Sequence, residues 1–148
     1  MSNQPLHATA LTLEGQGFLL MGASGSGKST LALQLLALGA RLVADDYVHL
    51  HAQGGQLWAE CPLTTQGMIE VWGHGLIHLP AEKWVPKTPL THAFALRRDF
   101  IPPRMPDPEW HEVEGIKLPL CTIDGLHVSA AAKVLAIVGA KIVDDGGA

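Results

Sequence analysis

One octet of the sequence has the residue types and the spacing needed to bind phosphate. Residues 22–29 read Gly-Ala-Ser-Gly-Ser-Gly-Lys-Ser and fit the pattern G-x-x-x-x-G-K-[ST]. Its glycines let successive backbone N–H groups approach phosphate oxygens without a Cβ clash. The pattern predicts that Lys28 reaches the β- and γ-phosphates of a nucleotide and that the Ser29 hydroxyl is offered to Mg²⁺. The predicted nucleotide-binding residues are Gly22, Ala23, Ser24, Gly25, Ser26, Gly27, Lys28, Ser29 and Thr30.

Two adjacent carboxylates, Asp45 and Asp46, follow the next apolar segment of the chain. From the end of a strand, a carboxylate can approach a bound Mg²⁺ or an attacking hydroxyl group. Taken alone, such a pair is more often a solvated turn, because exposed turn carboxylates are common.

The segments around the octet predict a strand, a loop and a helix in succession. Two strands are expected at 9–14 and 17–21, around the turn signal at residues 15–17. Strong helix formers follow from Ser29 until Gly39 supplies a C-terminal signal. A buried strand before a glycine-rich loop and a helix is the arrangement that phosphate binding requires.

The rest of the chain predicts antiparallel structure and irregular segments. Further strands are expected at 41–44 and 117–122, a hairpin around Gly54 and Gly55, and a C-terminal helix at 129–143. The stretch 67–79 contains several glycines, and 80–119 contains most of the ten prolines. We therefore expect irregular structure over 67–119.

Composition restricts the class of protein. A chain of 148 residues with 47% hydrophobic content favours one domain, expected at 1–142 with a flexible tail at 143–148. The net charge of −4 argues against nucleic acid as a partner. The sequence shows neither a signal peptide nor a transmembrane segment, and its two cysteines lack redox or zinc spacing, so a cytoplasmic protein without membrane association is expected.

Three motifs resemble the HPr kinase/phosphorylase family. Residues 42–46 read Leu-Val-Ala-Asp-Asp, as the family does after its P-loop helix. Residues 67–77, Gly-Met-Ile-Glu-Val-Trp-Gly-His-Gly-Leu-Ile, resemble the family signature centred on Glu-Ile-Arg-Gly-Leu-Gly-Ile. His7 precedes the phosphate loop much as the catalytic-site histidine of the family does. The resemblance extends from His7 to about Gly139 and covers the C-terminal catalytic part of long family members, so a short form without their N-terminal domain is expected.

The resemblance implies a fold, an activity and a set of roles. The fold is a single α/β P-loop kinase domain with a mixed sheet, similar to HPr kinase and phosphoenolpyruvate carboxykinase. The activity is ATP- and Mg²⁺-dependent phosphorylation of a serine on a small HPr-like phosphocarrier protein of a phosphotransferase system, by a homo-oligomer that is a hexamer in the family. Asp46 would be the catalytic base, supported by Lys28, His7 and Arg104, and the metal would be held by Ser29, Glu70 and Asp45.

Two departures from the family pattern leave other functions open. Trp72 stands where the signature has arginine, and residues 121–127 replace the glycine- and arginine-rich loop associated with phosphorolysis, which argues against phosphorylase activity. A nucleotide-gated regulatory module without transfer activity and a P-loop kinase acting on a small molecule are the alternatives. The sequence leaves open the identity of the acceptor and the choice among ATP, GTP and pyrophosphate.

Overall fold

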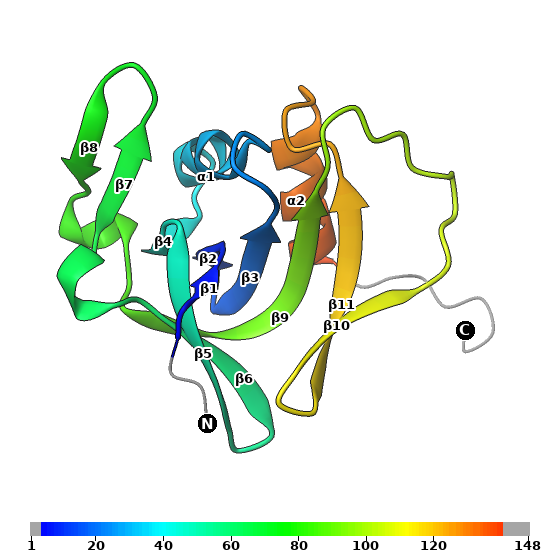
Figure 1. The fold of residues 1–148 in the computed structure, drawn as a ribbon, viewed down its shortest axis with the longest axis horizontal. Coiled ribbons are helices and arrows are strands. Elements are labelled where there is room, and N and C mark those ends of the chain that lie inside the picture. Colours follow the sequence, from blue (N-terminus) through cyan, green and yellow to red (C-terminus); the bar gives the residue numbers. More distant parts are fainter. Residues whose placement is uncertain (1–3, 141–148) are drawn as a thin grey trace.

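The computed structural model describes residues 4–140, which form a nine-stranded mixed sheet, a separate two-stranded hairpin and two α-helices (Figure 1). The expected domain end at 142 and the tail at 143–148 lie outside the described residues. The sheet order is β1-β5-β6-β9-β3-β2-β4, and β11 joins β9 with β10 at its outer side. The strands are β1 Leu6–His7, β2 Thr9–Leu13, β3 Gln16–Met21, β4 Arg41–Ala44, β5 Tyr47–Gln53, β6 Gln56–Glu60, β7 Met68–Val71, β8 Gly75–His78, β9 Lys87–Leu96, β10 Glu109–Val113 and β11 Ile116–Ile123.

Strand β9 is the centre of the sheet and changes partner along its length. Residues 87–89 pair antiparallel with β6, whereas the following residues pair parallel with β3 and β11. Pro89 stands at this change of partner, where a missing backbone N–H is tolerated. Gly17 of β3 lies against it, and a Cβ there would stand 2.3 Å from the Pro89 carbonyl oxygen. The expected mixed α/β sheet is therefore confirmed.

Each face of the sheet carries a hydrophobic core. Neighbouring residues of a strand point to opposite faces and so contribute to different cores. Phe18 and Leu20 of β3 face the core beneath the helices, whereas Leu19 between them faces a second core formed with β5, β6 and β11. The helices are α1 Lys28–Ala37 and α2 Ala130–Gly139, and they contribute Leu31, Leu35 and Val134 to the first core. In residues 4–140, no helix is long and apolar enough to cross a bilayer.

The locally encoded predictions are confirmed. Hairpins β2–β3 and β5–β6 form, and the second turns at Gly54 and Gly55, whose φ angles are 62° and 80°. The first turns at Glu14 and Gly15, one residue earlier than the turn expected at 15–17. Helix α1 ends before Gly39 (φ 108°), as the glycine signal indicates.

The expectation of irregular structure over 67–119 is wrong for much of that range. Residues 68–78 form the β7–β8 hairpin, and residues 87–96 form the central strand β9, followed by β10. Tertiary pairing overrides the local glycine and proline signals, because these residues stand at turns or at changes of strand partner. Residues 97–108 do lack helix and strand, as expected.

Candidate functional site

The predicted phosphate loop connects the end of β3 to the start of α1. Gly25 and Gly27 have φ angles of 83° and 100°, in the left-handed region that glycine adopts readily. A Cβ on Gly27 would also stand 2.8 Å from a methyl group of Leu126. The backbone angles therefore favour glycine at 27, and a side chain there would also displace Leu126 of the segment that precedes α2.

Lys28 is almost fully buried under this loop. Its Nζ donates hydrogen bonds to the carbonyl oxygens of Gly22 at 2.6 Å and Ala23 at 3.2 Å. Burial lowers the pKa of Lys28 from its usual 10.5, and the Asp46 and Asp45 carboxylates oppose that shift. The loop thus holds a cation at the first turn of α1, where the helix dipole also attracts anions.

Asp45 connects three elements of the site. Its Oδ1 accepts hydrogen bonds from the Ser29 hydroxyl at 3.1 Å and from the Thr9 hydroxyl at 3.2 Å. Its Oδ2 accepts one from the backbone N–H of Glu70 at 3.1 Å. Because Thr9 lies on β2, Ser29 on α1 and Glu70 on β7, this carboxylate fixes the hairpin against the helix.

Asp46 is paired with His7. The His7 Nε2 donates to Asp46 Oδ1 at 2.7 Å, and the His7 ring packs against Tyr47 with centroids 5.3 Å apart. Pairing of β1 with β5 places His7 opposite Tyr47 and so beside Asp46. The Asp46 backbone has a φ of 72°, and its N–H donates to the Thr9 hydroxyl at 3.3 Å. More than half of the Asp46 side chain is exposed, so an acceptor group could reach it.

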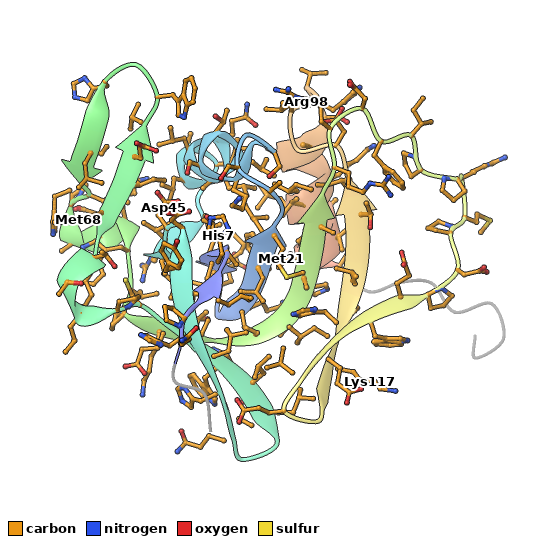
Figure 2. The ribbon with its side chains drawn as sticks, in the orientation of Figure 1. His7, Met21, Asp45, Met68, Arg98 and Lys117 are labelled. Atoms are coloured by element: carbon orange, nitrogen blue, oxygen red, sulfur yellow. The ribbon has the colours of Figure 1, made fainter. Side chains whose placement is uncertain are left out.

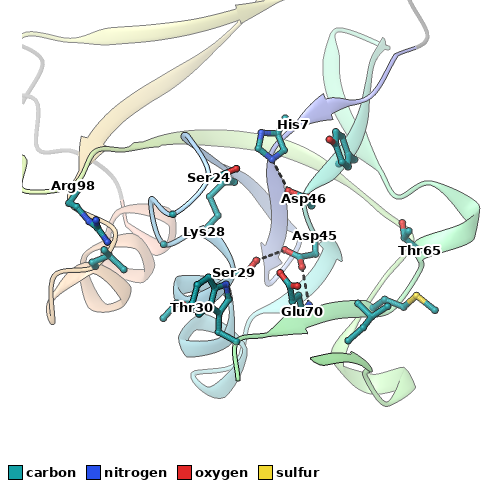
Figure 3. A pocket seen from close by; sticks show the side chains of 17 residues that line it. His7, Ser24, Lys28, Ser29, Thr30, Asp45, Asp46, Thr65, Glu70 and Arg98 are labelled. Atoms are coloured by element: carbon teal, nitrogen blue, oxygen red, sulfur yellow. Dashed lines mark hydrogen bonds and ion pairs between the residues drawn. The ribbon is translucent and has the colours of Figure 1, made fainter. Parts of the chain in front are cut away.

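One cleft of about 660 Å³ collects most of the predicted site residues (Figure 3). This volume lies in the range of small-molecule sites. The predicted residues along it are His7, Ser24, Gly25, Gly27, Lys28, Ser29, Thr30, Asp45, Asp46 and Glu70. Gly22, Ala23 and Ser26 instead line a second cleft of about 600 Å³, next to the end of β9.

The predicted Arg104 does not line this cleft. Arg104 lies exposed in the segment 97–108. Arg98 lies just after the end of β9 (Figure 2) and lines both clefts. Sequence reasoning also missed Thr9, which is fully buried and holds both aspartates. No sequence signal marks Thr9, because threonine in a strand is common. The other cleft residues that sequence reasoning did not assign to the site are Tyr47, Thr65, Met68, Trp72, Leu76 and Leu126.

The oxygen donors in the cleft fit a Mg²⁺ ion that binds together with phosphates. The Ser29 hydroxyl and the Asp45 carboxylate are adjacent, and Glu70 lines the same cleft. Mg²⁺ commonly takes one or two carboxylates and completes its shell with phosphate oxygens and water. Within residues 4–140, no three His, Cys, Asp or Glu side chains are grouped closely enough to hold a metal by themselves. These donors therefore suit an ion that binds together with nucleotide phosphates better than an ion held by protein side chains alone.

Comparison with known proteins supports the family resemblance of the sequence motifs. The chain is 45% identical over 76 residues to HPr kinase/phosphorylase of Clostridium tetani, a match that covers 51% of this chain and 25% of the relative. It is 44% identical over 75 residues to the HPr kinase/phosphorylase of Brevibacillus brevis, covering 50% and 24%. The chain thus spans about a quarter of the length of these relatives.

Structural comparison extends the similarity over most of the chain. The structure of the HPr(Ser) kinase/phosphatase from Coxiella burnetii superimposes with a TM-score of 0.79 and 26% sequence identity, covering 88% of this chain and 91% of the other. The family described as HPr Serine kinase C-terminal domain matches residues 1–82. Since that match covers more than half of the 148 residues, the chain belongs to the HPr serine kinase C-terminal domain family.

Proposed function

We propose that this protein is an ATP-dependent serine kinase that phosphorylates a small HPr-like phosphocarrier protein. The observation that carries the proposal is that one cleft contains a phosphate loop with its lysine, a hydroxyl–carboxylate pair suited to Mg²⁺, and an accessible aspartate paired with histidine. The names of the relatives, HPr kinase/phosphorylase, support the choice of acceptor. We further propose that it acts in the cytoplasm as a homo-oligomer.

The loop side of the cleft would bind the nucleotide. The backbone N–H groups of 22–27 and the Lys28 ammonium would bind the phosphates, and Thr30 lies beside them in the first turn of α1. Ser29, Asp45 and Glu70 would hold Mg²⁺, which when bound neutralises charge on the β- and γ-phosphates. The Thr9 and Ser29 hydroxyls already orient Asp45 for that role.

The other side of the cleft would receive the acceptor serine. Its hydroxyl oxygen forms a bond to the γ-phosphorus while the bond to the β,γ-bridging oxygen breaks, and ADP leaves with that electron pair. Asp46 would take the hydroxyl proton, and His7 would orient the carboxylate through the 2.7 Å hydrogen bond. In addition to Lys28, a second cationic side chain would stabilise the γ-phosphoryl group during transfer. Arg104 is the arginine that the family resemblance predicts, and Arg98 already lines the cleft.

The test is transfer from ATP to a carrier serine. Purified protein is incubated with Mg²⁺, γ-labelled ATP and an HPr-type carrier, and the modified residue is mapped by mass spectrometry. Labelled serine, lost in Lys28→Ala and Asp46→Asn, is the expected result. Label that appears only on a metabolite from a cell extract would indicate a small-molecule kinase instead. ATP binding without turnover on any acceptor would indicate a regulatory module, and either of these results would contradict the proposal.

A further inference from the structure

The outer part of the nucleotide cleft is apolar and exposed, unlike its charged interior. Trp72 is 84% exposed, Leu76 66% and Leu126 44%, and all three line the cleft that contains Lys28 and Ser29. Large apolar side chains that remain this exposed beside a polar cavity often mark a ligand-binding surface. The roles proposed for the phosphate loop and the aspartates do not explain this apolar rim, so its ligand is still unassigned.

The β7–β8 hairpin presents a defined face to the cleft. Met68 and Glu70 are two residues apart on β7 and both line the cleft, whereas Ile69 between them is fully buried in the core. Trp72, in the turn that follows β7, also lines the cleft. Leu76 of β8 stands directly opposite Glu70 in the antiparallel pairing, so it shares that face. One wall of the cleft therefore carries a carboxylate beside Asp45 and, in the turn at the end of β7, an indole ring.

This wall is held in place by contacts at its base. The Glu70 N–H donates to Asp45 Oδ2, and β7 packs against α1, beside which the hairpin stands in Figure 1. Gly67 at the start of the hairpin has a φ of 74°, and a Cβ there would stand 2.8 Å from Trp84 Nε1. Trp72 is therefore an exposed ring in the turn that directly follows β7, a strand whose position relative to the Asp45 carboxylate is fixed.

We propose that Trp72, with Leu76 and Leu126, forms the platform on which the base of the bound nucleotide stacks. The inference rests on the proposed nucleotide binding and adds the base subsite. Three observations select a base as the occupant. The rim residues line the same cleft as the phosphate loop, Leu126 lies where a Cβ on Gly27 would stand 2.8 Å from its methyl group, and the hairpin face continues from Glu70 beside the Ser29–Asp45 pair.

The indole side chain of Trp72 is suited to stacking on a nucleobase. An indole offers a flat π-face and no acceptor group, so it stacks on any nucleobase and discriminates weakly among them. The arginine expected from the family signature would instead present a cation and a fork of donors. Stacking at Trp72 predicts similar affinities for ATP and GTP and a weaker affinity for inorganic tripolyphosphate, which has no base.

Calorimetric titration with Mg²⁺–ATP and with Mg²⁺–tripolyphosphate tests the proposal. Trp72→Ala should weaken ATP binding by about 5- to 150-fold, the range that aromatic stacking of a base provides, and should leave tripolyphosphate binding unchanged. Trp72→Phe should retain most of the affinity. Trp110→Ala removes another exposed tryptophan, on β10 and outside the cleft, and should behave as wild type.

Fluorescence gives a second readout from the same ring. ATP should quench the indole emission of the wild type and of Trp110→Phe but not of Trp72→Phe, and tripolyphosphate should quench less. If the wild type bound ATP and tripolyphosphate equally well, the base platform would be refuted while phosphate binding stood. If it bound neither, the proposed nucleotide binding itself would fail. An unchanged ATP affinity in Trp72→Ala, with a raised KM for the carrier, would make the hairpin a protein-docking surface and overturn the proposal.

Discussion

Replacing Thr9 by valine tests whether a buried hydroxyl organises both aspartates. Thr9 is fully buried on β2, and its hydroxyl donates to Asp45 Oδ1 at 3.2 Å while accepting from the Asp46 N–H at 3.3 Å. Valine keeps the shape of the side chain but removes both hydrogen bonds. Asp45 retains Ser29 and Glu70 as donors, whereas the Asp46 N–H loses the acceptor that holds it at a φ of 72°.

The expected loss of stability in Thr9→Val follows from the two hydrogen bonds that the substitution removes. A hydrogen bond to a charged group contributes about 1.5–3 kcal/mol, and leaving the part-buried Asp46 N–H without its acceptor costs at most about 1–3 kcal/mol. Since Asp45 keeps its other donors, a total of about 2–4 kcal/mol is expected for Thr9→Val, measured by urea denaturation. The displaced carboxylates should also lower kcat for carrier phosphorylation by about 10- to 100-fold, because small misplacements of catalytic groups are costly.

Thr12→Val is the matched control. Thr12 is also buried on β2, but its hydroxyl accepts from the Thr88 hydroxyl, at 3.0 Å, and neither residue lines the cleft. Loss of this hydrogen bond in Thr12→Val should cost about 1 kcal/mol of stability and leave kcat unchanged. Both variants are assayed at temperatures well below their unfolding midpoints. Equal kcat values in the two variants would refute the organising role of Thr9.

Three further predictions concern the loop, its lysine and the predicted arginine. Gly27→Ala should cost about 1–3 kcal/mol in a denaturation experiment, because alanine is strained at φ 100° and its methyl group would meet Leu126. Burial lowers the pKa of Lys28 below 10.5, so at this group the unfolded chain binds more protons between the two pKa values, and its contribution to stability should rise with pH in that window. Because burial raises the pKa of Cys61 and Cys121, which act in the opposite sense, the measured quantity is the stability of the wild type minus that of Lys28→Met, and this difference should rise in urea denaturation up to about pH 10.5. Arg104→Ala should lower kcat at least about tenfold without changing stability, since the side chain is exposed. An unchanged kcat there would leave Arg98, which lines the cleft, as the supporting cation.

The parts of the site that the sequence predicted are those encoded over short distances. The phosphate loop is contiguous, so its spacing alone located it, whereas the Asp45–Asp46 pair after an apolar strand was assigned to the site through the family resemblance. The hairpins at Gly15 and Gly54 were predicted because their turns require φ angles that glycine adopts. The family resemblance added His7 and Glu70, which spacing could not connect to the loop.

The parts that were missed depend on pairing between distant segments. The central strand β9 was hidden by Pro89, which is tolerated only because the strand changes partner there. The contribution of Thr9 depends on the packing of β2 against β4 and on the backbone turn at Asp46, neither of which leaves a local signal. Arg98 entered the cleft because β9 ends beside the phosphate loop, a consequence of parallel pairing with β3.

In the proposed mechanism, one side of the cleft binds the nucleotide through Lys28 and the other activates the acceptor through Asp46. Single-turnover transfer from Mg²⁺–ATP to the carrier, measured together with the Kd for ATP, tests it most directly. Asp46→Asn preserves the size of the side chain, and its Kd should stay close to that of the wild type while the transfer rate falls by at least about 10²-fold. Lys28→Ala should weaken binding itself. Transfer at the wild-type rate by Asp46→Asn would contradict Asp46 as the catalytic base and the proposed transfer mechanism.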